Sequence, residues 1–319
     1  MRSIGFKVTA AVLVSAAVTL GAAADDVSSS YTVDAAWPTV PDGFTFGETA
    51  GVGVDSHNHV FIFHRGKDMP IMCVEGATGK IVHSFGEGMF LNAHGLEVDH
   101  EDNVWVTDTR THQVYKFTHD GELLLTVGER EKLGLDGTHF NQPTDVTVTP
   151  TGEFYVSDGY GNSRVAKFAA DGTFLFDWGK KGDAPGEFDL PHGITLDPKG
   201  NVYVCDRSNM RLQVFDPKGK FLRQWSGEQL GEVGRPWGVE YAPDGNLYVI
   251  DGSDMLGSTP NIARITKLTL EGKVLEHWSA YGSEPGQLSW GHDVAVGKDG
   301  AAYTAEVRNN NRPQKFVNK

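Results

Sequence analysis

Three histidines at nearly equal spacing are the residues of this sequence best suited to do chemistry. His94, His192 and His292 lie 98 and 100 residues apart, and they begin the similar segments HGLEVD, HGITLD and HDVAV. Three imidazoles that meet at one point can bind a metal ion and leave a fourth position for water or substrate. Zinc is the expected ion, although iron, copper and cobalt also accept imidazole ligands. The sequence predicts such a site if its fold brings the three segments together.

An internal repeat predicts the elements that would position these histidines. Each copy reads as four short strands of alternating apolar residues, separated by turns such as PTGE and PKGN, which is typical of one β-propeller blade. Six copies can be recognised, and they begin at Ala50, His94, Thr144, His192, Trp237 and His292. The predicted fold class is therefore all-β, a six-bladed β-propeller. The histidines open copies two, four and six, so they should converge near the axis from directions about 120° apart.

The two ends of the chain have separate interpretations. The last copy is one strand short, and the segment YTVDAAW from Tyr31 could supply that strand and close the ring. Residues 1–24 read as a signal peptide, with a basic start, an apolar run and a small-residue cleavage site. We therefore expect an exported protein, periplasmic or secreted, with one propeller domain over residues 25–319.

Composition excludes some partners. The formal net charge is −14, and no basic stripe stands out, so nucleic acid and anionic membranes are poor candidates. No second long apolar run follows the leader, so we expect no stable membrane insertion. We also expect a monomer.

Cys73 and Cys205 are the only cysteines. They could form one disulfide or remain as two buried thiols, and the sequence leaves both possibilities open.

The motifs permit a family comparison. The repeats, with stretches such as GDAPGEFDLPHG, resemble NHL repeats over nearly the whole mature chain. The three histidine segments, in order, resemble those of peptidyl-α-hydroxyglycine α-amidating lyase. In that family three axial histidines bind zinc, so the resemblance implies the same role for His94, His192 and His292.

The resemblance also implies catalytic and substrate-binding residues. FIFHRG places Arg65, and CDR places Arg207, where the family has arginines that contact substrate. Guanidinium groups suit a substrate that ends in a carboxylate. SDGYGNSR places Tyr160 where the family has its catalytic tyrosine, which would take a proton from the substrate hydroxyl. Considered alone, an arginine in such a loop is more often part of an exposed ion pair, and such a tyrosine is more often an aromatic residue of the core or the rim.

A structural calcium ion is implied as well. Val52 and Leu96 match positions whose backbone carbonyls bind calcium in the family, and Asp293 matches the carboxylate ligand. Oxygen donors of this kind suit Ca²⁺. From the sequence alone, Asp293 would have been assigned only a turn or capping role.

Three positions depart from the family pattern. The family usually has methionine two residues before the third histidine, and here Trp290 would reshape the substrate pocket. The family's disulfide cysteines are missing, since Gly161 occupies one such position and Cys205 is displaced by one residue from another. Substrate identity is therefore less well defined than the metal site.

The sequence thus predicts a zinc-dependent lyase that cleaves peptidyl- or acyl-α-hydroxyglycine to an amide and glyoxylate. A different carbinolamide, or a small α-hydroxy acid derivative, is an alternative substrate. A lactonase-like hydrolase is a rival, although such enzymes hold an axial calcium mainly with acidic and amide side chains. A non-enzymatic NHL binding module is the other rival, and it would need no axial histidines.

Overall fold

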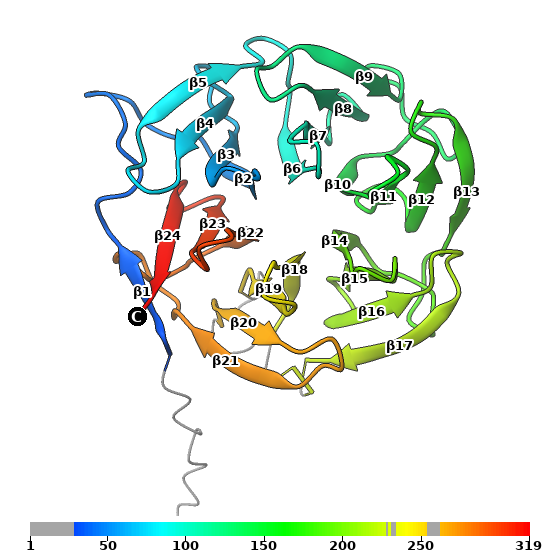
Figure 1. Cartoon of the computed structure of the whole chain (residues 1–319). Helices are drawn as coiled ribbons and strands as arrows, with labels where there is room; N and C mark the ends of the chain where they lie inside the picture. Colours follow the sequence, from blue (N-terminus) through cyan, green and yellow to red (C-terminus); the bar gives the residue numbers. More distant parts are fainter. Residues whose placement is uncertain (1–28, 228, 231–233, 254–261) are drawn as a thin grey trace, which may run out of the picture.

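The computed structural model describes residues 29–227, 229–230, 234–253 and 262–319. The secondary structure of this part of the chain consists of β-strands. They form six four-stranded antiparallel sheets around a central axis (Figure 1). The predicted six-bladed β-propeller is confirmed. The predicted signal peptide, residues 1–24, lies outside the described residues.

Each blade corresponds to one predicted repeat copy, with its first strand innermost. Blades 1 and 2 contain β2 (Thr49–Val54), β3 (His59–His64), β4 (Ile71–Glu75), β5 (Ile81–Phe85), β6 (Ala93–Val98), β7 (Val104–Asp108), β8 (Gln113–Phe117) and β9 (Leu123–Val127). Blades 3 and 4 contain β10 (Pro143–Val148), β11 (Phe154–Asp158), β12 (Arg164–Phe168), β13 (Phe174–Trp178), β14 (Pro191–Leu196), β15 (Val202–Asp206), β16 (Arg211–Phe215) and β17 (Phe221–Ser226). Blades 5 and 6 contain β18 (Pro236–Tyr241), β19 (Leu247–Asp251), β20 (Ile265–Leu268), β21 (Val274–Trp278), β22 (Gly291–Val296), β23 (Ala302–Glu306), β24 (Pro313–Asn318) and β1 (Tyr31–Asp34).

The ring closes through β1, as the sequence predicted. This strand pairs antiparallel with β24, from Tyr31 opposite Asn318 to Asp34 opposite Lys315. The Tyr31 ring also stacks on Trp278 of blade 5, with ring centroids 4.1 Å apart. The two ends of the described chain thus complete blade 6 together, and the edge of β24 is covered.

The apolar core lies between neighbouring blades. In β3, Phe61 and Phe63 pack with residues of blade 2, whereas Val60 and Ile62 pack with residues of blade 6. Successive side chains of a strand point to opposite faces of the sheet, so a second strand with both faces covered is apolar throughout. This explains the runs VFIF, VWV and FYV that mark the second strand of each copy.

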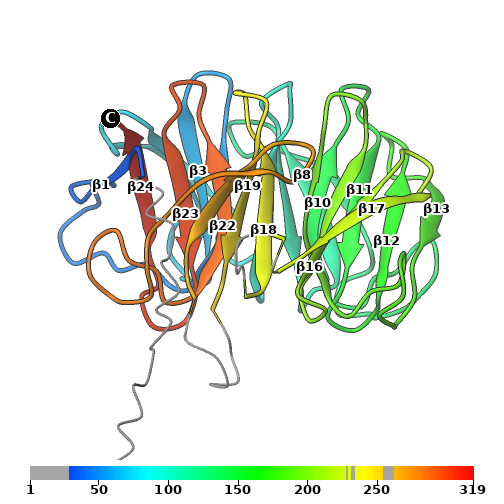
Figure 2. The same cartoon turned by 90° about the horizontal axis from the view of Figure 1, so that it is seen from below.

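The strands run between two faces of the ring, as Figure 2 shows from the side. The first strand of each blade starts at one face, and the second strand ends there. We call this face the histidine face, because it carries His94, His192 and His292. The turns between first and second strands lie on the opposite face, which we call the turn face.

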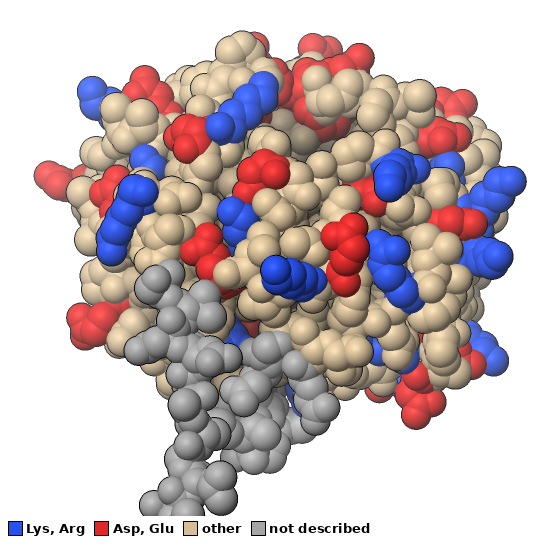
Figure 3. Space-filling model, turned by 60° about the horizontal axis from the view of Figure 1, so that its bottom comes forward, with Lys and Arg blue, Asp and Glu red and all other residues tan. Residues whose placement is uncertain are grey.

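Surface charge is mixed. On the side that Figure 3 shows, Lys and Arg side chains lie among Asp and Glu side chains and do not gather in one basic patch. The described residues contain no helix long and apolar enough to cross a membrane.

Candidate metal centre

The three predicted histidines meet at the axis. His94, His192 and His292 lie on β6, β14 and β22, and each is at most 3% exposed. One ligand atom from each imidazole lies within 4.8 Å of those of the other two. The ring centroids are 4.5–4.9 Å apart. Three nitrogen donors this close together are what a zinc ion bound by three imidazoles requires.

The loop before each histidine is held by a carboxylate at the end of the second strand of the same blade. Asp108 accepts the backbone N–H of Asn92 at 2.8 Å, and Asp206 accepts that of Asp189 at 2.7 Å. Glu306 holds the third loop in the same way. Since these carboxylates are buried, the hydrogen bonds fix where each histidine strand begins.

Each imidazole is oriented by the next blade around the ring. The Nδ1 atoms of the three histidines lie 2.6–2.7 Å from backbone carbonyl oxygens, and these oxygens belong to Thr144, Trp237 and Ala50. A carbonyl can only accept a hydrogen bond, so each Nδ1 carries the proton and each Nε2 keeps its lone pair. A backbone carbonyl that holds the other ring nitrogen in this way is typical of histidines that bind metal.

Burial keeps the imidazoles neutral. It lowers the pKa of His94 to about 3, and the positive charge of Arg65 adds to the effect. The pKa values of His192 and His292 are also well below the ordinary value, mainly because of burial and the neighbouring imidazoles. His292 Nε2 is buried and has no hydrogen-bond partner in the structure. A buried nitrogen with a free lone pair is the donor that a metal ion requires.

Tyr160 and Arg207 reach the centre from the histidine face. The Tyr160 hydroxyl lies 3.2 Å from His94 Nε2 and 3.4 Å from His192 Nε2. Arg207 Nη1 donates a hydrogen bond to the same hydroxyl at 3.3 Å. The Arg207 guanidinium also lies over the Trp237 ring, 3.4 Å from its centroid. The structure therefore brings both residues to the metal centre, with Tyr160 partly exposed toward solvent.

Arg65 and Trp290 lie further out. Arg65 Nε donates to the carbonyl of Ala93 at 3.1 Å, and its guanidinium forms an ion pair with Glu48. The Trp290 ring packs against Trp237 with centroids 5.8 Å apart. Arg65 lies near enough to affect the His94 imidazole electrostatically, whereas Trp290 contributes to the wall beside the centre.

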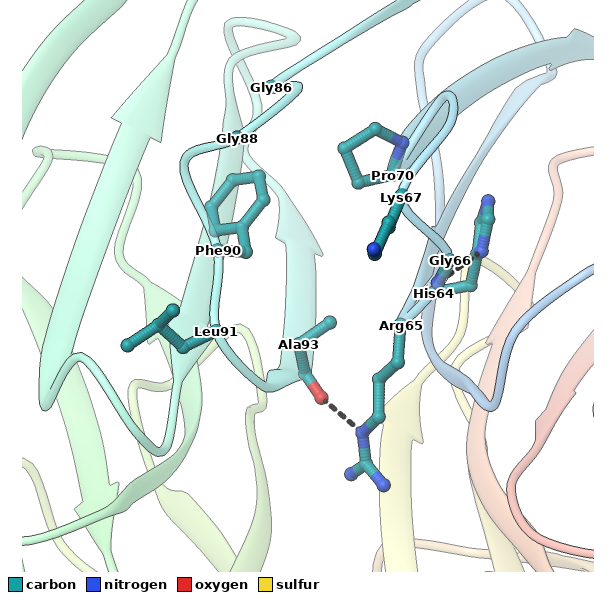
Figure 4. Close-up of a pocket in the computed structure, with 10 residues that line it drawn as sticks. All are labelled: His64, Arg65, Gly66, Lys67, Pro70, Gly86, Gly88, Phe90, Leu91 and Ala93. Atoms are coloured by element: carbon teal, nitrogen blue, oxygen red, sulfur yellow. Dashed lines mark hydrogen bonds between the residues drawn. The ribbon is translucent and has the colours of Figure 1, made fainter.

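A cavity of about 430 Å³ adjoins Arg65 between blades 1 and 2 (Figure 4). His64, Arg65 and Lys67 line one side, and Phe90 and Leu91 line the other. The cavity thus combines cationic and apolar groups next to the strand that carries His94.

A second level of the channel contains four carboxylates, where the sequence predicted calcium ligands. Val52, Leu96 and Asp293 line one cavity of about 30 Å³, together with further acidic residues. These residues are Glu97, Asp145 and Glu240, and sequence reasoning missed them. Burial and the neighbouring negative charges raise the pKa of all three, and burial raises the pKa of Asp293 to about 7.

Glycines leave room for these carboxylates. Asp145 and Asp293 follow the first residue of copies three and six, and glycine follows it in the other four copies. A Cβ on Gly95 would overlap the Asp145 carboxylate, and one on Gly238 would lie 3.1 Å from Asp293 Oδ1. Glycine at these two positions therefore leaves room for the carboxylates of blades 3 and 6, which lie opposite each other in the ring. This alternation was readable in the sequence by comparing positions between copies.

The two cysteines do not pair. Cys73 and Cys205 lie in blades 1 and 4, and both are buried free thiols. Of the two possibilities that the sequence left open, the structure supports the second.

Comparison with known proteins agrees with the predicted repeats. The NHL repeat model matches residues 140–168 and 188–215. A streptogramin B lyase structure has a TM-score of 0.62 at 17% identity and covers 91% of this chain and 98% of that one. That similarity shows the fold alone.

Two relatives are more informative about chemistry. The chain is 32% identical to peptidyl-alpha-hydroxyglycine alpha-amidating lyase 1 of Drosophila melanogaster, over 92% of this chain and 61% of the relative. It is 36% identical to peptidyl-glycine alpha-amidating monooxygenase B of Xenopus laevis, over 60% of this chain and 25% of that protein. The chain therefore matches only part of each relative's length. The family resemblance found in the motifs is confirmed by these matches.

Proposed function

We propose that this NHL-repeat propeller is a zinc-dependent carbon–nitrogen lyase. The premise is its homology, over 92% of its length, to a peptidyl-alpha-hydroxyglycine alpha-amidating lyase. Its substrate would be a peptidyl- or acyl-α-hydroxyglycine, and its products an amide and glyoxylate. The observation that carries the proposal is the convergence of three neutral, buried imidazoles whose Nδ1 atoms are all held by backbone carbonyls.

The residues fit a zinc ion. Three nitrogen donors from His94, His192 and His292 match a catalytic zinc site with an open fourth position. The orphaned Nε2 of His292 is satisfied once an ion is bound. When bound, zinc would act as a Lewis acid toward the substrate oxygen.

Tyr160 is proposed as the general base. Its hydroxyl lies beside two of the imidazoles that would bind zinc and accepts a hydrogen bond from Arg207, so the phenol oxygen is held where it can take the substrate hydroxyl proton. The oxygen's electrons then form the aldehyde C=O bond of glyoxylate as the N–C bond breaks. The released nitrogen takes one proton and becomes the amide. This proton balances the one that Tyr160 removed from the substrate hydroxyl.

The arginines are proposed to bind the carboxylate. Arg207 is fixed by its contact with Trp237 and can present its guanidinium edge to the substrate's carboxylate. Arg65 would add a second positive charge, and the ion pair with Glu48 would open or be shared. The cavity of Figure 4 would hold the acyl or peptide portion, with Phe90 and Leu91 contacting its apolar part. Trp290 would narrow the opposite wall.

Calcium is proposed for the carboxylate level of the channel. The cavity there is lined by Asp293, Val52 and Leu96, and its three additional acids increase the negative charge available to a hard cation. Such an ion would offset the repulsion between carboxylates that are buried together. Its expected role is structural, because this level lies beyond the imidazoles from the proposed substrate cavity.

Glyoxylate release tests the proposed reaction. Zinc-loaded protein is incubated with an acyl-α-hydroxyglycine such as α-hydroxyhippuric acid, and glyoxylate is measured over time. We expect catalysis by the wild type, and a rate close to the spontaneous one for His192→Ala. His100→Ala, at an exposed position on the face opposite Tyr160, is the matched control and should keep full activity. Equal rates for wild type and His192→Ala would reject the proposal.

A further inference from the structure

A second group of metal-binding side chains lies away from the axis, between blades 1 and 2. His59 begins β3, Cys73 lies in β4, and His119 lies in the turn between β8 and β9. One ligand atom from each lies within 4.8 Å of the other two. We call these three residues the blade 1–2 cluster. Thiolate and imidazole are the ligands that zinc prefers in proteins.

The thiol occupies a position that the repeat otherwise gives to a cation. Cys73 pairs with Phe61 of the second strand. In four other blades the residue opposite the corresponding aromatic is lysine, namely Lys116, Lys167, Lys267 and Lys315. Blade 4 has Val214 there. Blade 1 therefore has a thiol, which can bind a metal ion, at the position where four other blades have a lysine, whose charge would repel one.

Beside the turn aspartate, blade 1 has His59 where blade 4 has Asn201. Asp197 of blade 4 accepts the backbone N–H of Asn201 through Oδ1, and the Asn201 amide through Oδ2. Asp55 accepts the backbone N–H of His59 in the same way. Its Oδ2, however, lies 2.9 Å from His59 Nδ1 and 3.1 Å from His119 Nε2. One buried carboxylate thus orients two imidazoles, an arrangement typical of metal-binding histidines.

His83 fixes the remaining part of the cluster. It pairs with Cys73 across β4 and β5, and its Nε2 donates to the backbone carbonyl of His119 at 2.8 Å. The His59 and His119 side chains are 30% and 29% exposed, whereas Cys73 is fully buried. An ion can therefore reach the imidazoles from solvent and meet the thiol beneath them.

We propose that the blade 1–2 cluster binds a second transition-metal ion, preferentially zinc, which joins blade 1 to blade 2. His59 and Cys73 supply ligands from one blade and His119 supplies one from the next, with Asp55 as the carboxylate that positions the imidazoles. The thiol loses its proton on binding. The site is independent of the reaction proposed above, because His59 and His119 lie at the turn face and Cys73 lies midway along the third strand of blade 1, whereas the axial histidines begin their strands at the other face.

Cobalt substitution tests this site, because only a thiolate ligand gives a sulfur-to-cobalt charge-transfer band in the near ultraviolet. The purified full chain is stripped of metal and titrated with Co²⁺, while absorbance and bound cobalt are measured. For the wild type we expect two equivalents of tightly bound cobalt and a charge-transfer band. For Cys73→Ser we expect loss of the band and of one equivalent.

Three further variants make the outcome decisive. His119→Gln, at a partly exposed turn, should also lose one equivalent and the band even if Cys73→Ser folds poorly. Cys205→Ser changes the other buried thiol and should behave as wild type. His192→Ala should lose the axial equivalent and keep the band, which separates this proposal from the lyase proposal. A single equivalent without a charge-transfer band in the wild type, or a band that survives Cys73→Ser, would overturn it.

Discussion

At the residue scale, the metal centre is built from contacts between blades. His94, His192 and His292 each donate Nδ1–H to the first residue of the following copy, so no ligand is oriented by its own strand alone. Tyr160 adds a hydroxyl where the Nε2 lone pairs meet. In the proposed reaction the imidazoles bind zinc, and Tyr160, Arg207 and Arg65 act on the substrate at the remaining position.

Replacing Tyr160 by phenylalanine should separate catalysis from metal binding. The substitution removes the proposed base and leaves the three imidazoles and their carbonyl partners in place. We expect kcat to fall by about 10²–10⁴-fold, the usual contribution of a positioned general base, while the zinc content stays at the wild-type level. Glyoxylate release and metal analysis on the same preparations measure the two effects. An unchanged kcat would show that another group takes the proton.

Arg207→Lys should reduce substrate recognition without loss of charge. Lysine can neither stack flat on Trp237 nor present two parallel N–H groups to a carboxylate. Losing one charge-assisted hydrogen bond, worth about 1.5–3 kcal/mol, should lower kcat/KM about 10–150-fold. Arg223→Lys is the control, because Arg223 also lies over a tryptophan, Trp225, away from the centre. Equal kcat/KM losses in both variants would argue against a specific role for Arg207.

At the element scale, the closing strand β1 connects the start of the described chain to its end. Tyr31 is 6% exposed, stacks on Trp278 and bonds to the Tyr248 hydroxyl, with 3.1 Å between the two oxygens. These contacts join blade 6 to blade 5 at the place where the polypeptide is discontinuous around the ring. Stability should therefore be sensitive to this single side chain.

Tyr31→Ala should lower the free energy of unfolding by about 3–5 kcal/mol, as expected when a large buried aromatic is truncated. Denaturant unfolding followed by tryptophan fluorescence measures the change. Tyr281→Ala is the matched control, because Tyr281 is 43% exposed, and it should change stability by less than about 0.5 kcal/mol. A similarly small loss for Tyr31→Ala would mean that the ring is held closed without this contact.

The sequence predicted the blades well because each copy must bury alternate side chains against both neighbours. This requirement repeats VWV-like strands and D-x-x-G turns, and it placed His94, His192 and His292 at equivalent positions. The closing role of Tyr31 followed from the missing strand. The carboxylates Glu97, Asp145 and Glu240 were missed, because a single acidic residue in a strand is usually solvent-exposed, and only the closed channel brings these acids into one cavity.

At the scale of the whole molecule, the closed ring creates an axial channel with two chemically different levels. Imidazoles form the level at the histidine face, and carboxylates form the level below it. The acidic overall composition, with a net charge of −14, adds a general preference for cations to the local one. The axis therefore offers two levels that could hold different cations, in addition to the site proposed between blades 1 and 2.

Calcium should stabilise the protein in a pH-dependent manner. Burial raises the pKa of Asp293 to about 7, and the pKa values of Glu97, Asp145 and Glu240 are raised too. Between about pH 4 and pH 7 the calcium-free folded state holds protons that the unfolded chain has released, so its stability should fall as the pH rises through this range. If calcium occupies this level as proposed, it binds the deprotonated carboxylates of the folded state and should restore stability at pH 8 but much less at pH 5.

Thermal unfolding at pH 5 and pH 8, with zinc held constant and calcium absent or present, measures this effect. Asp293→Asn removes one charge at nearly constant shape, so its calcium-free form should lose less stability as the pH rises, and calcium should stabilise it less. Asp171→Asn, at an exposed turn of blade 3, is the control and should retain the full calcium response. If calcium raised the unfolding temperature equally at both pH values, or equally in wild type and Asp293→Asn, the ion would bind outside the channel carboxylates.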